Sequence, residues 1–123
     1  MPVARHNGFR YDLLPHLADV LEACDHYTYA IWDGEAIKVG KSCAHPVQRC
    51  ADLQTGNPRT LRLVAYSAVL TEAQAHRRLN HWRIRGEWFR VCPEVVRAIA
   101  TWCWVDVGAL SELMHQLAGR RVP

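Results

Sequence analysis

The stretch Tyr27-Thr-Tyr-Ala-Ile-Trp-Asp-Gly-Glu-Ala-Ile-Lys-Val-Gly40 decides the fold of this chain. Two short runs rich in aromatic and β-branched residues flank Asp33-Gly34, a dipeptide typical of two-residue hairpin turns. If this dipeptide forms the turn, counting back along both strands places Tyr29 opposite Lys38. Directly opposed residues share a sheet face, with Cβ atoms roughly 4.5–5.5 Å apart. We therefore expect a phenol beside an amine, a pairing suited to phosphate chemistry.

Strict alternation divides the hairpin into two faces of different character. The more polar face carries Tyr27, Tyr29, Ile31, Ala36, Lys38 and Gly40. The other face is mostly apolar and suited to a core; it carries Thr28, Ala30, Trp32, Ile37 and Val39. The hairpin therefore predicts a sheet with one face committed to the core and another available for a site.

The composition fits one domain over residues 1–123, with half of the residues hydrophobic and a formal net charge of +3. No apolar run approaches the roughly 20 residues that a membrane span needs, and the N-terminus lacks the apolar core of a signal peptide. The five cysteines are odd in number and show no CxxC spacing, which indicates reduced thiols in a cytoplasmic protein. A zinc site from Cys43, His45 and Cys50 is an alternative with atypical spacing.

Helix signals appear before and after the hairpin. Apolar residues recur at helical spacing over about 14–24, which predicts an N-terminal helix. His45-Pro46 opens a second helix to about Gln54, because proline suits the first helical position. Gly56-Asn57-Pro58 then stops it. Leu61 to Leu70 alternates and predicts a third strand.

The rest of the chain is predicted to be mostly helical. Thr71 and Gln74 form a capping-box pattern, so a helix starts at Glu72 and continues until Gly86-Glu-Trp-Phe89 breaks it. Two C-terminal helices are expected over about 93–118. The first is opened by Pro93 and runs to about Trp102, and the second is capped by Asp106. The second helix has an apolar stripe formed by Val107, Leu110, Leu113, Met114 and Leu117. The predicted class is α+β, sandwich-like, with a small three-stranded antiparallel sheet flanked by helices.

The order of these elements and motifs resembles the GIY-YIG endonuclease superfamily, closest to the branch whose second motif reads KIG. The resemblance covers about residues 27–91, and the predicted helices at about 14–24 and 93–118 lie outside it. The matching pieces are Tyr27-Thr-Tyr29, Lys38-Val-Gly40, Gly40-Lys-Ser42, Arg49, the Glu72 and His76 pair, and Gly86-Glu-Trp-Phe89.

The resemblance implies a divalent-metal-dependent endonuclease that hydrolyses phosphodiester bonds in DNA, using Mg²⁺ or Mn²⁺. It assigns Tyr29 to activating or positioning the attacking water and Arg49 to neutralising the transition state. Lys38 occupies the place of the second motif's tyrosine. It either favours the phenolate of Tyr29 or binds phosphate as a point charge. His76 either shuttles a proton or binds phosphate.

Two glutamates compete for the metal. Glu72 begins the helix that carries the metal glutamate in the wider superfamily, whereas Glu87 belongs to the EWF motif of this branch. The asparagine that follows the metal glutamate in many members of the superfamily has no clear counterpart here. The candidate nucleic-acid contacts are Tyr27, Lys41, Arg77, Arg83 and Arg85.

Two functions from other classes are alternatives to an enzymatic function. The first is a non-catalytic module on the nuclease fold that binds nucleic acid or a protein, for example as a regulator or inhibitor in a mobile element. It would use the basic surface or the tryptophans Trp102 and Trp104. The second is a homo-oligomeric structural protein.

Overall fold

The computed structural model describes residues 26–121, so the helix predicted over about 14–24 lies outside the described residues. The elements are, in chain order, β1 (Tyr27–Trp32), β2 (Ala36–Ser42), α2 (Pro46–Gln54), β3 (Arg62–Ser67), α3 (Glu72–Leu79), the 3₁₀ turn η3 (Asn80–Trp82), β4 (Arg83–Arg85), β5 (Trp88–Arg90), α4 (Pro93–Ile99), β6 (Trp104–Val105) and α5 (Val107–Arg121).

The strands form a six-stranded antiparallel sheet in the order β4-β5-β2-β1-β3-β6. The expectation of a small three-stranded sheet was therefore wrong, although the architecture is α+β. The three unexpected strands, β4, β5 and β6, contain three, three and two residues. Runs of two or three residues are too short to show the alternation of apolar and polar side chains that is typical of a strand. Only their hydrogen-bonded pairing with neighbouring strands identifies them.

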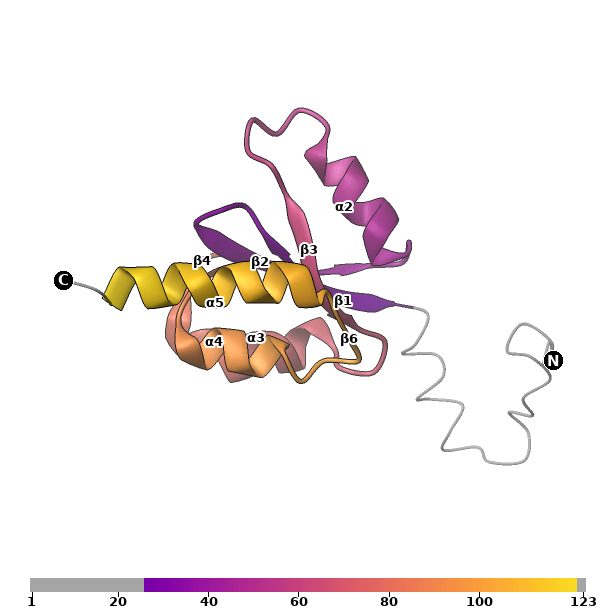
Figure 1. The fold of residues 1–123 in the computed structure, drawn as a ribbon. Helices are drawn as coiled ribbons and strands as arrows, with labels where there is room; N and C mark the ends of the chain where they lie inside the picture. The colour runs from indigo at the N-terminus through magenta and orange to yellow at the C-terminus, as the bar shows by residue number, and fades with distance from the viewer. Residues whose placement is uncertain (1–25, 122–123) are drawn as a thin grey trace, which may run out of the picture.

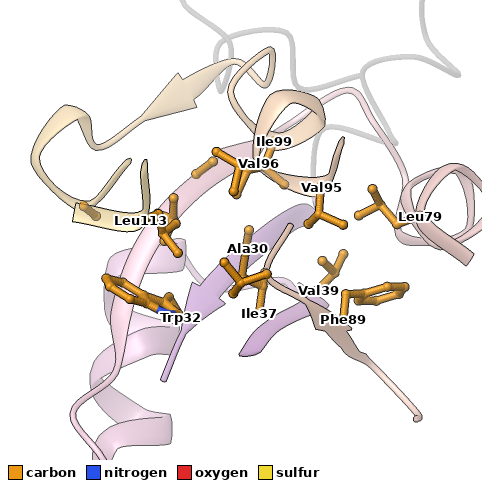
Figure 2. Close-up of a cluster of buried hydrophobic side chains, with 14 of the residues drawn as sticks. Ala30, Trp32, Ile37, Val39, Leu79, Phe89, Val95, Val96, Ile99 and Leu113 are labelled. Carbon is orange, nitrogen blue, oxygen red and sulfur yellow. The ribbon is translucent and has the colours of Figure 1, made fainter. Parts of the chain in front are cut away.

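The helices cover the two faces of the sheet unequally (Figure 1). Helix α2 packs on β1 and β3, whereas α3 packs on β2, and α4 and α5 pack on β3 and on each other. The main core lies between the sheet and these last three helices, as Figure 2 shows. Among its members are Ala30, Trp32, Ile37, Val39, Leu79, Phe89, Val95, Val96, Ile99 and Leu113. Full burial of each large aliphatic or aromatic side chain here contributes about 1.5–3 kcal/mol.

The opposite face of the hairpin is buried as well. Tyr29 and Ile31 are 1% and 0% exposed, yet neither belongs to the main core cluster. Both point to the face that α2 covers, because side chains alternate along a strand. The division of the hairpin into two faces is therefore confirmed, although the second face is largely buried beneath α2.

The predicted hairpin register was wrong by two residues. Tyr29 lies opposite Gly40 and Ile31 lies opposite Lys38. The turn centres on Gly34 and Glu35, with a φ of 100° at Gly34, the place where type II′ turns put glycine. Asp33 is the first residue of the turn: its N–H donates to the Ala36 carbonyl, and its carboxylate accepts hydrogen bonds from the backbone N–H groups of Glu35 and Ala36. A shift of two residues leaves every side chain on its predicted face, since the strand period is two.

Most helix starts agree with the sequence signals. Helix α2 spans the predicted residues, and Thr71 and Gln74 form the complete capping box of α3. Asp106 accepts a hydrogen bond from Ala109 N–H at the start of α5. The predicted apolar stripe of α5 is only partly core, because Leu113 is fully buried whereas Val107 and Met114 are 76% and 57% exposed.

Two helix ends differ from the prediction. Helix α3 stops at Leu79, and the following residues form η3 and β4 instead of continuing the helix towards Gly86. Helix α4 stops at Ile99 instead of about Trp102, and the chain turns into β6. In both places the sheet edge offers hydrogen bonds to a short strand. No helix within residues 26–121 has the length and apolar character needed to cross a membrane.

Replacing Asp33 with alanine removes both side-chain hydrogen bonds that close the hairpin turn. We expect Asp33→Ala to lower the free energy of unfolding by about 1–2 kcal/mol, since each bond contributes about 0.5–1.5 kcal/mol. Asp33→Asn keeps an acceptor oxygen and should lose less than half as much. Urea unfolding followed by circular dichroism measures both, and equal losses would contradict the role of the acceptor.

Candidate functional site

The centre of the candidate site is a close approach between Tyr29 and Gly40. A Cβ added at Gly40 would lie 2.6 Å from Cζ of Tyr29, and closer still to its hydroxyl. The Tyr29 ring therefore lies directly over the backbone of β2, in space that only glycine leaves open. Its hydroxyl has no hydrogen-bond partner among the described residues, and the Tyr29 side chain as a whole is 1% exposed.

Glu87 reaches the same point from the turn between β4 and β5. Strand β5 pairs with β2, placing Trp88 opposite Lys38, and the Glu87 carbonyl accepts a hydrogen bond of 2.8 Å from Val39 N–H. The Glu87 Oε1 atom would lie 2.9 Å from a Cβ added at Gly40. The Tyr29 hydroxyl and the Glu87 carboxylate thus meet over one glycine.

Lys38 completes this cluster. Its Nζ atom lies 3.1 Å from Glu87 Oε1 and 5.8 Å from the centre of the Trp88 ring. The Lys38 side chain is 23% exposed and that of Glu87 is 41% exposed, so both remain accessible to a ligand. Three of the predicted site residues therefore lie together, joined by Gly40. We call Tyr29, Lys38, Gly40 and Glu87 the Gly40 cluster.

Arg49 belongs to α2, the helix that covers the Tyr29 face of the sheet. Its position follows from His45 and Pro46, because the Arg49 N–H bonds to the His45 carbonyl in the first helical turn. The Arg49 Nε atom is buried and has no hydrogen-bond partner among the described residues. An unpartnered buried guanidinium nitrogen costs free energy, so an acceptor such as a phosphate oxygen would stabilise it.

His76 contacts the backbone of β2 from α3. Its Nε2 atom lies 2.7 Å from the Val39 carbonyl oxygen, and its ring lies 5.2 Å from that of Phe89. A carbonyl only accepts, so Nε2 carries the proton and donates. The contact fixes the strand next to Gly40, and in the neutral ring Nδ1 is left as the acceptor.

Glu72 lies elsewhere, in a separate hollow of about 270 Å³. Thr28 and Lys41 line this hollow with it, on the sheet face that packs against α3. No residue of the Gly40 cluster, nor Arg49, lines it. The structure therefore separates the two glutamates that compete for a metal, and groups only Glu87 with Tyr29.

The three arginines predicted to contact nucleic acid differ in exposure and in hydrogen bonding. Arg77 and Arg85 are exposed. Arg83 instead braces the turn that carries Glu87: it donates to Asn80 Oδ1 at 3.1 Å and to the Gly86 carbonyl, and it lies 5.0 Å from the Phe89 ring centre. A contact from any of these arginines to nucleic acid stays a prediction.

A group of aromatic rings that the sequence did not predict lies beside the cluster. Tyr27 contacts His45 and Tyr66, and Tyr66 stacks on Trp104. Tyr66 lies opposite Tyr29 in the pairing of β1 with β3. Only that register would have indicated that these rings meet, because they come from four separate segments.

The described cysteines, Cys43, Cys50, Cys92 and Cys103, are all free thiols. No group of three metal-ligating side chains exists within the described residues, so the zinc alternative from Cys43, His45 and Cys50 is not formed. Burial raises the pKa values of Cys50 and Cys92. The pKa of Cys103 is lowered, first by the hydroxyl of Ser67 and then by backbone hydrogen bonds.

The geometry explains the direction at Cys103. The Ser67 Oγ atom accepts hydrogen bonds from the N–H groups of Val69 and Leu70, which leaves its own hydrogen for Cys103 Sγ at 3.4 Å. A lowered pKa means a larger thiolate fraction at neutral pH. We expect iodoacetamide to modify Cys103 faster than Cys50 or Cys92 at pH 7, as peptide mass spectrometry can measure.

The variant Ser67→Ala separates this effect from simple exposure. It removes the hydroxyl donor, so alkylation of Cys103 should slow and shift to higher pH while the thiol stays exposed. An unchanged rate in the folded variant would contradict the assigned cause.

Gly40→Ala tests the close approach at the centre of the site. The added methyl group meets the buried Tyr29 ring, so we expect a loss of about 1–3 kcal/mol in unfolding free energy. Gly119 in α5 is the control, because a Cβ there meets nothing within 4 Å. Gly119→Ala should be neutral or stabilising by up to about 1 kcal/mol. Equal changes in the unfolding free energy of the two variants, measured by chemical denaturation, would contradict the close approach of Tyr29 to Gly40.

A family model described as the T5orf172 domain matches residues 26–104. The matched span contains the Gly40 cluster, Arg49, His76 and the aromatic rings described above. No curated protein and no solved structure gives a significant match.

Proposed function

This chain belongs to the T5orf172 domain family, and on that premise we propose that it is a divalent-metal-dependent endonuclease that hydrolyses phosphodiester bonds in DNA. The family is compatible with a nuclease-like or a DNA-binding role. The observation that favours hydrolysis is the meeting of the Tyr29 hydroxyl and the Glu87 carboxylate over Gly40, with Lys38 in contact.

The cationic groups suit a phosphodiester. Arg49 has a buried, unpartnered Nε atom on the helix above the Tyr29 face. Lys38 supplies a mobile ammonium that now contacts Glu87. In this proposal the two cations bind the non-bridging oxygens and stabilise the charge that develops on them in the transition state.

Glu87 is the residue that would hold the metal. Mg²⁺ needs only one or two carboxylates and keeps several waters, so the exposed carboxylate of Glu87 fits it without further protein ligands. A bound Mg²⁺ or Mn²⁺ ion would supply a Lewis acid at the leaving oxygen. With its carboxylate partner holding a metal, Lys38 would be available to bind the phosphate.

The remaining groups orient the reactants. The Tyr29 hydroxyl, free of other partners among the described residues, positions the attacking water. His76 does not contact the phosphate directly in this proposal, because it donates its Nε2 proton to the Val39 carbonyl oxygen. We therefore assign His76 to holding β2 in place beside Gly40.

A second function has its own supporting observation. The Lys38 ammonium lies 3.1 Å from Glu87 and neutralises the only carboxylate of the Gly40 cluster. A cluster kept in that state binds phosphate without hydrolysing it. This is the non-catalytic nucleic-acid-binding module, whose binding is indifferent to metal.

Cleavage of single- and double-stranded DNA with Mg²⁺ or Mn²⁺ tests the proposal. We expect Tyr29→Phe, Arg49→Ala and Glu87→Gln each to lower the rate by about 100-fold or more, the usual effect of removing one transition-state group. Arg97→Ala should stay within a few-fold, since Arg97 is an exposed arginine of α4 that belongs neither to the cluster nor to the candidate nucleic-acid contacts. Glu72→Gln should also retain activity.

Three results would change this assignment. Equal cleavage by all variants, or none by the native chain, would overturn the nuclease. Loss of cleavage in Glu72→Gln but not in Glu87→Gln would move the metal to the start of α3. DNA binding that persists in EDTA, with no products at any metal concentration, would favour the binding module.

A further inference from the structure

Four aromatic rings form one contiguous group on the sheet face that carries Tyr29. We call His45, Tyr27, Tyr66 and Trp104 the aromatic track. The ring centres of Tyr27 and Tyr66 are 5.7 Å apart, those of His45 and Tyr66 are 5.1 Å apart, and those of Tyr66 and Trp104 are 5.0 Å apart. Tyr27 and His45 close the group at 5.4 Å.

The track begins beside the Gly40 cluster. Tyr27 precedes Tyr29 by two residues on β1 and shares its face, which places the two side chains about 7 Å apart along the strand. Tyr66 lies directly opposite Tyr29 across the β1–β3 pair. A polymer held at Tyr29 would therefore meet the rings of Tyr27 and Tyr66, which contact each other.

The track ends in a hollow of about 500 Å³ between α2 and the β3–β6 edge of the sheet. Trp104 belongs both to the track and to the wall of this hollow. Apolar side chains of α2, of β3 and of the residue before β3 form much of the remaining wall, among them Val47, Ala51, Leu61 and Leu63. Two charged residues, Arg62 and Asp106, also line it. The hollow has the volume and apolar character of a small-molecule site.

These rings lie outside the main hydrophobic core. None of them belongs to the main cluster of buried residues, His45 is exposed, and Trp104 is 36% exposed. Val47, on the facing helix, is 59% exposed. An aromatic surface of this kind favours a flat, apolar ligand, and Lys38 of the neighbouring Gly40 cluster supplies a cation for a charged backbone.

We propose that the aromatic track stacks the unpaired bases of a nucleic-acid strand, with the base beyond Tyr66 entering the hollow beside Trp104. The position of the backbone rests on the proposed function, since it puts one phosphate at the Gly40 cluster. Bases inside an intact duplex are covered on both faces by their neighbours, so stacking on these rings requires a single-stranded segment. Aromatic stacking is sequence-tolerant, because every base has a π-face.

Binding in EDTA tests the track without requiring cleavage. The probes are a fluorescently labelled oligo(dT), an abasic oligomer of equal length and charge, a duplex, and the oligo(U) equivalent. We expect the native chain to bind oligo(dT) at least about tenfold more tightly than the abasic oligomer or the duplex, which corresponds to one or two stacked bases. The RNA probe identifies the preferred sugar.

Variants assign the effect to the track. Trp104→Leu should lower affinity for oligo(dT) by about tenfold and leave the abasic oligomer unaffected, whereas Trp104→Phe should retain most of the affinity. Met114→Gln is the matched control, because it removes an exposed apolar side chain of α5 outside the track. Thermal unfolding shows that each variant is folded.

The outcomes separate this inference from the nuclease. Equal binding of oligo(dT) and the abasic oligomer, or no change in the folded Trp104→Leu variant, would overturn base stacking even if cleavage occurs. A base-dependent affinity that Trp104→Leu removes would support stacking even if no metal ion produces cleavage.

Discussion

The site depends on β2 having a strand on each side. Strand β1 brings Tyr29 over Gly40, and β5 brings Glu87 to the same glycine through the hydrogen bond between Val39 N–H and the Glu87 carbonyl. A side chain larger than hydrogen at residue 40 would separate these groups. The absence of a Cβ at Gly40 therefore allows a phenol, a carboxylate and an ammonium to share a space of a few ångströms.

The sheet serves two purposes because its two faces are covered differently. Helices α3, α4 and α5 bury one face in a continuous apolar core, which supplies most of the stability (Figure 2). The short helix α2 covers only part of the other face, on β1 and β3. The Gly40 cluster and the aromatic track lie on this second face, where polar and aromatic groups can meet a ligand without disturbing the core.

Some features of the fold could be predicted from local signals, and others could not. Pro46, Thr71 and Asp106 mark helix starts correctly, because capping depends on a few neighbouring residues. The hairpin faces were also right, since alternation survives a two-residue shift. The register itself was wrong because the central turn residues are Gly34 and Glu35, a turn that the Asp33 carboxylate stabilises by accepting hydrogen bonds from Glu35 and Ala36. Strands β4, β5 and β6 were missed because nothing local distinguishes them from loops.

The sequence by itself determined the hairpin, its two faces, the helix starts and the residue types able to act on a phosphodiester. Only the tertiary structure decided which glutamate joins Tyr29. The pairing of β5 with β2 brings Glu87 to Gly40, and α3 places Glu72 in a separate hollow. The aromatic track likewise exists only in three dimensions. Local patterns encode periodicity and capping, whereas the meeting of distant residues depends on strand pairing that no short segment specifies.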